Sequence, residues 1–279
     1  MGGEWLNGLN RNLVKKIIQK AVDNGITLFD FLFNEITYIK NIAQAIKGKR
    51  DKIILQTHLG TGEKEGKPKR DRNVKHSREY FERILNLFDT DFIDVINIQY
   101  IRKSEYETVV GKNGLLNLAN QLKEEGKARY IGASTHNISI GKKLAEIETI
   151  DSIMFPINIA NHFLEGRKEF LETCEQNNVA VIAIKPFLGG KLFEKDQTIY
   201  VAKYQSGGIS KRKKIPKNIS PAQCLHYCLS QTAISTVIPG VSSLQEIEQI
   251  LKYNKISEKE KDFIPFFKAY HGKSFEGGK

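Results

Sequence analysis

The sequence predicts an α/β protein with a parallel sheet and helices outside it. Apolar segments of strand length alternate with amphipathic segments of helix length along nearly the whole chain of 279 residues. Strict alternation of this kind is typical of βαβ units, in which successive strands run parallel. The composition, with 40% hydrophobic and 27% charged residues, fits a soluble globular protein and argues against disorder.

The first predicted element is a helix over residues 11–23. Gly25 follows it as a stop signal, and its apolar residues have the spacing of one helix face: Leu13, Ile17, Ile18, Ala21 and Val22. The segment "ITLFDF" at 26–31 then reads as a strand. Further strands are predicted at 53–58, 92–99, 129–134, 152–157, 179–186 and 235–240. Further helices are predicted at 36–47, 76–88, 114–124, 139–147 and 166–176, from Ser220 and Pro221 (a cap and a first-turn proline), and from 243 onward.

The predicted strands fall one short of the eight that close a (β/α) barrel. The remaining strand is either absent or lies in the first few residues, where "MGGEW" shows little strand character. An open doubly wound sheet is the competing fold. That fold usually carries a G-x-G-x-x-G turn after an early strand, and this sequence has none. The open sheet therefore loses its usual support, and the barrel is the expected fold.

The composition excludes several other classes of protein. No apolar run approaches the roughly 20 residues that span a bilayer, and the N-terminus lacks the apolar region of a secretory signal. We therefore expect a cytoplasmic protein without a membrane partner. Cys174, Cys224 and Cys228 are too scattered for a disulfide framework and are expected to be reduced.

The charge distribution argues against a nucleic-acid partner. The net charge is +11, but the basic residues are spread along the chain among 32 acidic ones, which is typical of a lysine-rich surface. The densest basic cluster is "SKRKKIPK" at 210–217, which we assign to a basic surface loop over 205–217. Two interpretations fit this loop: a mobile surface segment, or a clamp over an anionic cofactor.

Polar residues end several of the predicted strands. In "RDKIILQTHLG" at 50–60, the apolar run Ile53–Leu55 is followed by Gln56, Thr57 and His58. The active site of a (β/α) barrel lies at the C-terminal ends of its strands. The other candidates at such ends are Asp30, Glu35, Asn97, Gln99, Ser134–Asn137, Asn158 and Lys185, of which Asn137 also suits a helix cap. No metal site is expected, because the six histidines show neither H-E-x-x-H nor Cys/His spacing.

Six segments of the chain resemble the aldo/keto reductase family in order and spacing. They are "GITLFDF", "KGKRDKIILQTH", "FDTDFIDVINIQ", "LKEEGKARYIGASTHN", "VAVIAIKPFLGGKL" and "STVIPGVSSLQEIEQIL". The resemblance covers nearly the whole chain and implies a single aldo/keto reductase-like barrel domain over 1–279, of the TIM-type (β/α)8 fold. It also implies NADP or NAD bound at the strand C-termini and a small-molecule carbonyl substrate reduced by hydride transfer.

Within the family, the sequence most resembles the bacterial and archaeal branch that has "GxSTH" and "KPxxGG" segments. Its members often carry a ferredoxin-like, cysteine-rich C-terminal tail, which this sequence lacks, so we expect no iron–sulfur cluster. The family's first barrel strand would precede "MGGEW", so the resemblance implies a barrel whose first strand is truncated. A missing first strand would expose a sheet edge and favour self-association.

The family's catalytic residues are an aspartate, a tyrosine, a lysine and a histidine. Asp30 matches the aspartate, whereas Glu35 stands at the tyrosine position, His58 at the lysine position and Gln99 at the histidine position. Tyr38 is either part of the following helix or a displaced proton donor. The resemblance thus implies a catalytic set of changed residue types.

A proton could still be transferred by these residues. A tyrosine needs a nearby ammonium group to act as an acid near neutral pH. Glu35 and His58 could instead form a carboxylate–imidazole pair, since histidine titrates near pH ~6.5. His58 could equally be an idle polar residue, and Asp30 could serve structure alone. Gln99 can orient a group but not transfer a proton.

The residues that the family uses for its cofactor are retained in part. Ser134 matches the family serine that meets the nicotinamide amide, Asn158 matches the asparagine of the following strand, and Lys185 agrees with the "KPxxGG" branch. Met154 and Ile184, however, stand where a glutamine and an aromatic residue are expected.

The last strand leads into a potential phosphate site. Gly240 to Ser242 open a helix whose N-terminal amides can hold a phosphate, and Glu246 falls where the family contacts the adenosine end. No arginine occupies Ser242 or Ser243, so the choice between NAD and NADP stays open. Lys211–Lys214 of the basic loop are the other source of a phosphate clamp.

Three functions follow from these residues. The first is an NAD(P)-dependent oxidoreductase of aldo/keto reductase type with a degenerate catalytic tetrad. The second is a cofactor-binding but redox-silent regulatory or partner protein. The third is a non-redox lyase or isomerase that uses Glu35 and His58.

Overall fold

The computed structural model describes residues 1–276 with the exception of 34, 66, 195–197, 201–211 and 217. Most of the predicted basic loop at 205–217, including Lys211, lies outside the described residues. The chain divides into two compact units. Unit 1 comprises residues 1–134, 149–151 and 240–247, and unit 2 comprises 135–148, 152–239 and 248–279. The single domain expected over 1–279 stays a prediction.

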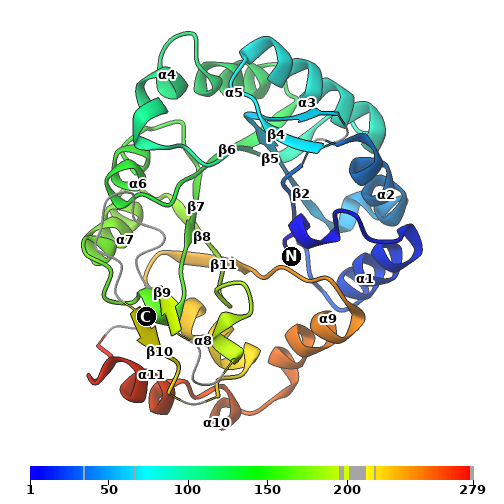
Figure 1. Ribbon diagram of the computed structural model, residues 1–279. Coiled ribbons are helices and arrows are strands. Elements are labelled where there is room, and N and C mark those ends of the chain that lie inside the picture. Colours follow the sequence, from blue (N-terminus) through cyan, green and yellow to red (C-terminus); the bar gives the residue numbers. More distant parts are fainter. Residues whose placement is uncertain (34, 66, 195–197, 201–211, 217, 277–279) are drawn as a thin grey trace. The chain divides into compact units, whose positions relative to one another are not determined.

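Unit 1 contains parallel strands in the order β1-β2-β5-β6, with helices along them (Figure 1). The strands are β1 (Leu28–Phe31), β2 (Ile54–Leu59), β5 (Ile93–Ile98) and β6 (Ala128–Ser134). The helices are α1 (Arg11–Asp23), α2 (Ile36–Ile46), α3 (Val74–Phe88), α4 (Tyr106–Val110) and α5 (Leu115–Glu124). An antiparallel hairpin, β3 (Thr61–Lys64) with β4 (Lys67–Arg70), follows β2. Single 3-10 turns lie at η1 (Glu4–Leu6), η2 (Arg50–Lys52) and η3 (Lys103–Glu105).

Local sequence signals explain these elements. Asn10 caps α1 by accepting a hydrogen bond from the Asn12 amide, and the helix buries Val14, Ile17, Ile18 and Ala21 on one face. β5 is buried at every position, the pattern of a parallel strand that is covered on both faces. Each such fully buried apolar side chain stabilises the fold by about 1.5–3 kcal/mol relative to its exposed state.

The register of the parallel strands decides which polar side chains meet. Asp30 on β1 pairs with Gln56 on β2, and His58 on β2 pairs with Asn97 on β5. Because side chains alternate between the faces of a strand, Gln56 and His58 point to the same face. The register therefore aligns Asp30, Gln56, His58 and Asn97 at the C-terminal ends of three neighbouring strands.

The first residues of the chain run beside β1. Gly2 forms isolated parallel bridges with Asp30 and with Gly240, and the Gly3 amide donates to the Asp30 carbonyl. A side chain at Gly3 would collide with its surroundings, since a Cβ there would lie 2.6 Å from the Tyr38 hydroxyl. These isolated bridges lie outside the named strands, and they place Gly2 and Gly3 beside the β1 backbone at Asp30.

Unit 2 contains the parallel strands β7 (Ser152–Pro156), β8 (Ala180–Ile184) and β11 (Ile234–Ile238), with β8 between the other two. Its helices are α6 (Ile138–Ala145), α7 (Arg167–Gln176), α8 (Pro221–Leu229), α10 (Glu258–Lys261) and α11 (Ile264–His271). Helix α9 (Leu244–Leu251) begins in unit 1 and ends in unit 2. The remaining elements are the antiparallel pair β9 (Thr198–Tyr200) and β10 (Arg212–Lys214), with η4 (Ile159–Asn161), η5 (Lys191–Phe193) and η6 (Lys252–Lys255).

The predicted start of α8 is confirmed. Ser220 and Gln223 form a reciprocal capping box, with Pro221 at the first helical position. Cys174, Cys224 and Cys228 are buried free thiols, as expected. Among the residues that the structure describes, no helix combines the length and the apolar character needed to cross a bilayer.

Candidate active site

A buried carboxylate–imidazole pair lies at the ends of β1 and β2. Asp30 Oδ1 is 2.6 Å from His58 Nε2, and Gln56 Nε2 donates to the same oxygen at 2.7 Å. Only 7% of Asp30 and 3% of His58 are exposed. Charge-assisted hydrogen bonds of this length in a low-dielectric setting hold both groups in one geometry.

The hydrogen-bonded chain continues across β5 to β6. Asn97 Nδ2 lies 3.0 Å from His58 Nδ1 and donates to Ser134 Oγ at 3.2 Å. The Ser134 hydroxyl also accepts from the Tyr100 amide at 2.7 Å and donates to the Ile98 carbonyl at 3.3 Å. Four adjacent strands thus contribute to one buried polar line.

The two carboxylate oxygens of Asp30 differ in their hydrogen bonds. Oδ1 accepts from both Gln56 and His58, whereas none of the described residues donates a hydrogen bond to Oδ2. The carboxylate is therefore anchored through Oδ1.

Glu35 is the N-cap residue of α2. Its carboxylate caps α2 by accepting hydrogen bonds from the amides of Thr37 at 2.7 Å and Tyr38 at 2.6 Å. A negative group at a helix N-terminus is stabilised by the helix dipole as well as by these bonds. His58 accordingly pairs with Asp30, which corrects the expected Glu35–His58 pair.

Tyr38 is a buried residue of α2, and its hydroxyl has no hydrogen-bond partner among the residues that the structure describes. Burial raises its pKa well above 10.0, and the nearby charges of Asp30 and Glu4 raise it further. A tyrosine in such surroundings keeps its proton. The interpretation of Tyr38 as a helix residue is confirmed, and these charges oppose its use as a displaced proton donor.

Gln99 lies at the rim, one residue past the end of β5. Its side-chain Oε1 is buried and has no hydrogen-bond partner in the described part of the chain. Arg72 fixes this rim, since its Nη2 donates to the carbonyls of Gln99 at 2.7 Å and Tyr100 at 3.0 Å. Gly60 has a φ of 82° and leaves room for Arg72, which a Cβ at that position would strike.

The predicted phosphate position at the start of α9 is occupied by protein groups. Glu246 Oε2 accepts from the Ser242 amide at 2.6 Å and from the Ser242 hydroxyl at 2.9 Å. The indole of Trp5 covers Gly240, where a Cβ would lie 2.3 Å from the indole Cδ1. Both contacts use groups that a nucleotide phosphate would need.

The cofactor candidates of unit 2 are also engaged. Asn158 caps η4 through its Oδ1, and its Nδ2 donates to the Lys185 carbonyl at 3.3 Å. Lys185 directly follows β8 and has a φ of 57°, an uncommon conformation for a side chain of this size. Asn137 caps α6, as predicted, and burial followed by the positive charge of Lys185 lowers the pKa of His136 to about 3.

A nicotinamide dinucleotide fits these residues in donor and acceptor chemistry. In unit 1 the Ser134 hydroxyl can pair with a carboxamide and the amide of Ser242 can bind a phosphate; in unit 2 Asn158 carries a side-chain amide of matching chemistry. In the structure each of these groups has a protein partner. Nucleotide binding at Ser242 therefore requires an exchange of Glu246 for phosphate.

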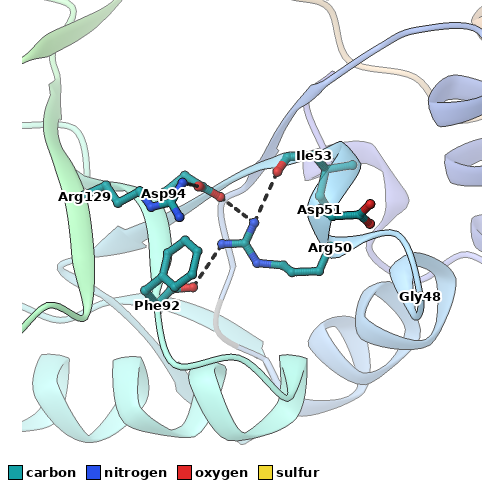
Figure 2. A pocket seen from close by; sticks show the side chains of 7 residues that line it. All are labelled: Gly48, Arg50, Asp51, Ile53, Phe92, Asp94 and Arg129. Atoms are coloured by element: carbon teal, nitrogen blue, oxygen red, sulfur yellow. Dashed lines mark hydrogen bonds and ion pairs between the residues drawn. The ribbon is translucent and has the colours of Figure 1, made fainter.

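A separate pocket of about 480 Å³ lies at the opposite ends of β2, β5 and β6 (Figure 2). Asp94 accepts from Arg50 at 2.7 Å and from Arg129 at 3.3 Å. Both guanidinium groups lie over the Phe92 ring, at 4.5 Å and 4.0 Å from its centroid. Asp94 forms ion pairs with both arginines. We call these three residues the Arg50–Asp94–Arg129 clasp and assign it a structural role, because it connects neighbouring strands.

Some polar residues of the site were recognisable in the sequence, but their contacts were not. Gln56 and Asn97 were visible as polar residues in apolar strands, which is the available signal, but their contacts with Asp30 and His58 depend on strand register. The Arg50–Asp94–Arg129 clasp gave no pattern, because its members come from separate segments.

Parallel strands with ionisable side chains at their C-terminal ends define the class of β/α proteins with active sites at that edge. A family model, described as the aldo/keto reductase family, matches residues 1–269. The chain belongs to the aldo/keto reductase family. This family assignment implies an oxidoreductase.

Individual proteins agree with this assignment. The chain is 25% identical over 261 residues to the "Uncharacterized oxidoreductase YqkF" of Bacillus subtilis, covering 87% of this chain and 82% of that protein. It is 26% identical to "Probable aldo-keto reductase 1" of Glycine max, with 94% and 81% of the two chains covered.

Solved structures show the same fold. The holo form of the aldo-keto reductase AKR11C1 from Bacillus halodurans has a TM-score of 0.76 at 20% identity, covering 99% of this chain and 93% of that chain. An aldo/keto reductase from Klebsiella pneumoniae in complex with NADP and acetate has a TM-score of 0.67 at 17% identity, covering 97% and 90%. The predicted TIM-type (β/α)8 barrel fold is confirmed.

Proposed function

We propose that this protein is an NAD(P)-dependent oxidoreductase that reduces a small-molecule carbonyl and moves the proton through Asp30 and His58. The observation that carries the proposal is the 2.6 Å contact between Asp30 Oδ1 and His58 Nε2 at the strand ends. A reduced nicotinamide supplies the hydride to the carbonyl carbon when it is bound. The protein has to deliver one proton to the oxygen that becomes an alkoxide.

The Asp30–His58 pair is suited to that delivery. When the pair holds one proton in addition to the His58 N–H, it can pass that proton from Asp30 Oδ2 to the alkoxide oxygen. The O–H bond of the alcohol forms, and the pair returns to a carboxylate beside a neutral imidazole. Water then restores the proton. Proton transfer by a positioned side chain contributes about 10²–10⁴-fold to a rate.

The cofactor-binding residues proposed in unit 1 are Ser134, Gly240 and Ser242, and Glu246 has to release the Ser242 amide before a phosphate can bind there. Asn158 and Lys185 are the cofactor-binding candidates of unit 2. We leave NADP and NAD as alternatives, and we propose a cytoplasmic location without a nucleic-acid partner. The support comes from the resemblance of the sequence segments to the family and from the NADP named for the Klebsiella pneumoniae protein.

Nucleotide titration tests the proposal. The purified wild-type protein is expected to quench NADPH or NADH fluorescence at submillimolar concentration and to consume the nucleotide with a panel of aldehydes and ketones. Asp30→Asn and His58→Gln are expected to lower kcat at least 100-fold and to leave the nucleotide Kd within about twofold. Absence of nucleotide binding by the folded wild-type protein would contradict the proposal.

A redox-silent partner protein is the second candidate. The engaged hydroxyl of Ser134 and the capping role of Glu35 favour it, because both residues are tied to the protein scaffold. Nucleotide binding without turnover on aldehydes, ketones or quinones, together with stable complexes in pull-down experiments, distinguishes it from the oxidoreductase.

The lyase or isomerase alternative has lost its proposed acid–base pair, because Glu35 caps α2 and His58 contacts Asp30. It predicts activity on a keto substrate after all nucleotide has been stripped. Full activity of a His58→Ala protein would exclude it.

A further inference from the structure

We propose that Asn97 is a positioning residue that keeps His58 neutral and thereby places the transferable proton of the pair on Asp30. The part that concerns reaction rate depends on the proposed function above. The part that concerns the protonation state of His58 does not.

Asn97 has the geometry of a two-way donor. It is fully buried on β5, and its Nδ2 group faces both His58 Nδ1 at 3.0 Å and Ser134 Oγ at 3.2 Å. The two hydrogens of the amide account for these two contacts. The Oδ1 atom, by contrast, has no hydrogen-bond partner in the described part of the chain.

This geometry selects one tautomer of His58. A nitrogen that faces an NH₂ group has to accept, so Nδ1 carries no proton, and the single proton of the neutral ring lies on Nε2. That proton points at Asp30 Oδ1. The opposite tautomer would set N–H against NH₂ at Nδ1 and a lone pair against the carboxylate at Nε2.

The same contact disfavours the charged imidazolium. Protonation of Nδ1 would place a hydrogen against the NH₂ of Asn97, and relief would require the amide to turn and release Ser134. An additional proton on the pair is therefore carried by the carboxylate. Because Oδ1 already accepts from Gln56 and His58, Oδ2 is the oxygen that carries it.

Histidine NMR tests the proposal without cofactor or substrate. Protein labelled with ¹⁵N in its histidines is compared with His58→Gln, which identifies the His58 signals. At neutral pH the wild type is expected to show Nε2 protonated and Nδ1 unprotonated. Asn97→Asp places an acceptor against Nδ1 and is expected to give an imidazolium protonated at both nitrogens.

A matched control is Asn86→Asp, the same change on the exposed face of α3. It is expected to leave the His58 signals and turnover unchanged. Turnover by Asn97→Asp is expected to fall at least tenfold in kcat, with the nucleotide Kd within twofold of wild type.

A protonated Nδ1 in the wild type, or unchanged His58 signals in Asn97→Asp, would overturn the proposal. If Asn97→Asp does not fold, the wild-type spectrum alone decides. The proposed oxidoreductase function fails on a different result, the absence of nucleotide binding, so the two failures are distinguishable.

Discussion

At the scale of single residues, Asp94 joins three neighbouring strands of unit 1. It stands on β5, contacts Arg129 on β6 and Arg50 just before β2, and accepts from the Leu55 amide at 2.9 Å. The carboxylate is 6% exposed, so these contacts are made largely out of water. Removing one partner of such a group leaves the others without compensation.

Asp94→Asn is expected to lower the free energy of unfolding by about 1–3 kcal/mol, because one oxygen remains for Leu55 while both ion pairs lose their charge. Urea denaturation measures the change. Asp91→Asn, at an exposed position, is the control and is expected to have no measurable effect. Equal stabilities of Asp94→Asn and wild type would show that the clasp contributes nothing.

Glu35 offers a second test at this scale. If its role is to cap α2, Glu35→Ala should cost about 0.5–2 kcal/mol of stability while kcat stays within about twofold. Glu35→Asp should recover much of the stability, since aspartate is a good cap residue. A large loss of kcat with unchanged stability would instead assign Glu35 to the chemistry.

At the scale of elements, the start of α9 combines a cap with a predicted phosphate position. Ser242 and Glu246 form the same type of contact as Ser257 and Glu260 at the start of α10, where Glu260 accepts from the Ser257 amide at 2.9 Å. One carboxylate thus neutralises each helix N-terminus.

Glu246→Gln is expected to tighten nucleotide binding about threefold to tenfold, because the charge that competes with phosphate for the Ser242 amide is removed. Isothermal titration with NADPH and NADH measures it. Glu260→Gln makes the equivalent change on α10 and should leave the affinity unaltered. Weaker binding by Glu246→Gln would mean that the carboxylate itself contacts the nucleotide, as the family resemblance implied.

Helices and strands could be predicted from the sequence where the spacing of apolar residues along the chain determines the secondary structure. The predicted helix at 11–23 matches α1 (Arg11–Asp23), and the strand at 53–58 matches β2 (Ile54–Leu59) within one residue. The hairpin β3–β4 was missed, because "TGEKEGKPKR" is polar, contains a proline and shows no alternation.

The candidate site was predictable only in part, for the same reason. Residue patterns placed Asp30 and His58 at strand ends, and the shared edge of parallel strands brings such ends together. Which carboxylate meets His58 depends on strand register and on competition from free helix amides. The amides at the start of α2 bind the Glu35 carboxylate. The strand register places His58 next to Asp30, so these two side chains form the pair.

At the scale of the whole molecule, the partly buried histidines His162 and His271 make stability depend on pH. Burial, followed by the charges of Arg167 and His271, lowers the pKa of His162 from 6.5 to about 3. Burial also lowers the pKa of His271 to about 4. Between about pH 6.5 and 4 the unfolded chain binds more protons than the folded one at these sites, so stability falls as pH falls.

The free energy of unfolding is therefore expected to decline steadily from pH 7 to pH 4. His162→Gln should flatten that decline, because one of the groups that bind protons on unfolding is gone. His271→Gln should flatten it as well. Chemical denaturation at a series of pH values gives the slopes, and an unchanged slope in both variants would place the dependence elsewhere.

The position of Trp5 gives this protein a built-in optical probe. It is the single tryptophan of the chain, it is 57% exposed, and its indole lies on Gly240 beside the start of α9. Any ligand that reaches the Gly240 backbone has to move that ring. Tryptophan fluorescence excited selectively therefore reports on the surroundings of Gly240 alone. Rapid mixing with a dinucleotide would then measure the rate of binding at this position without an attached dye.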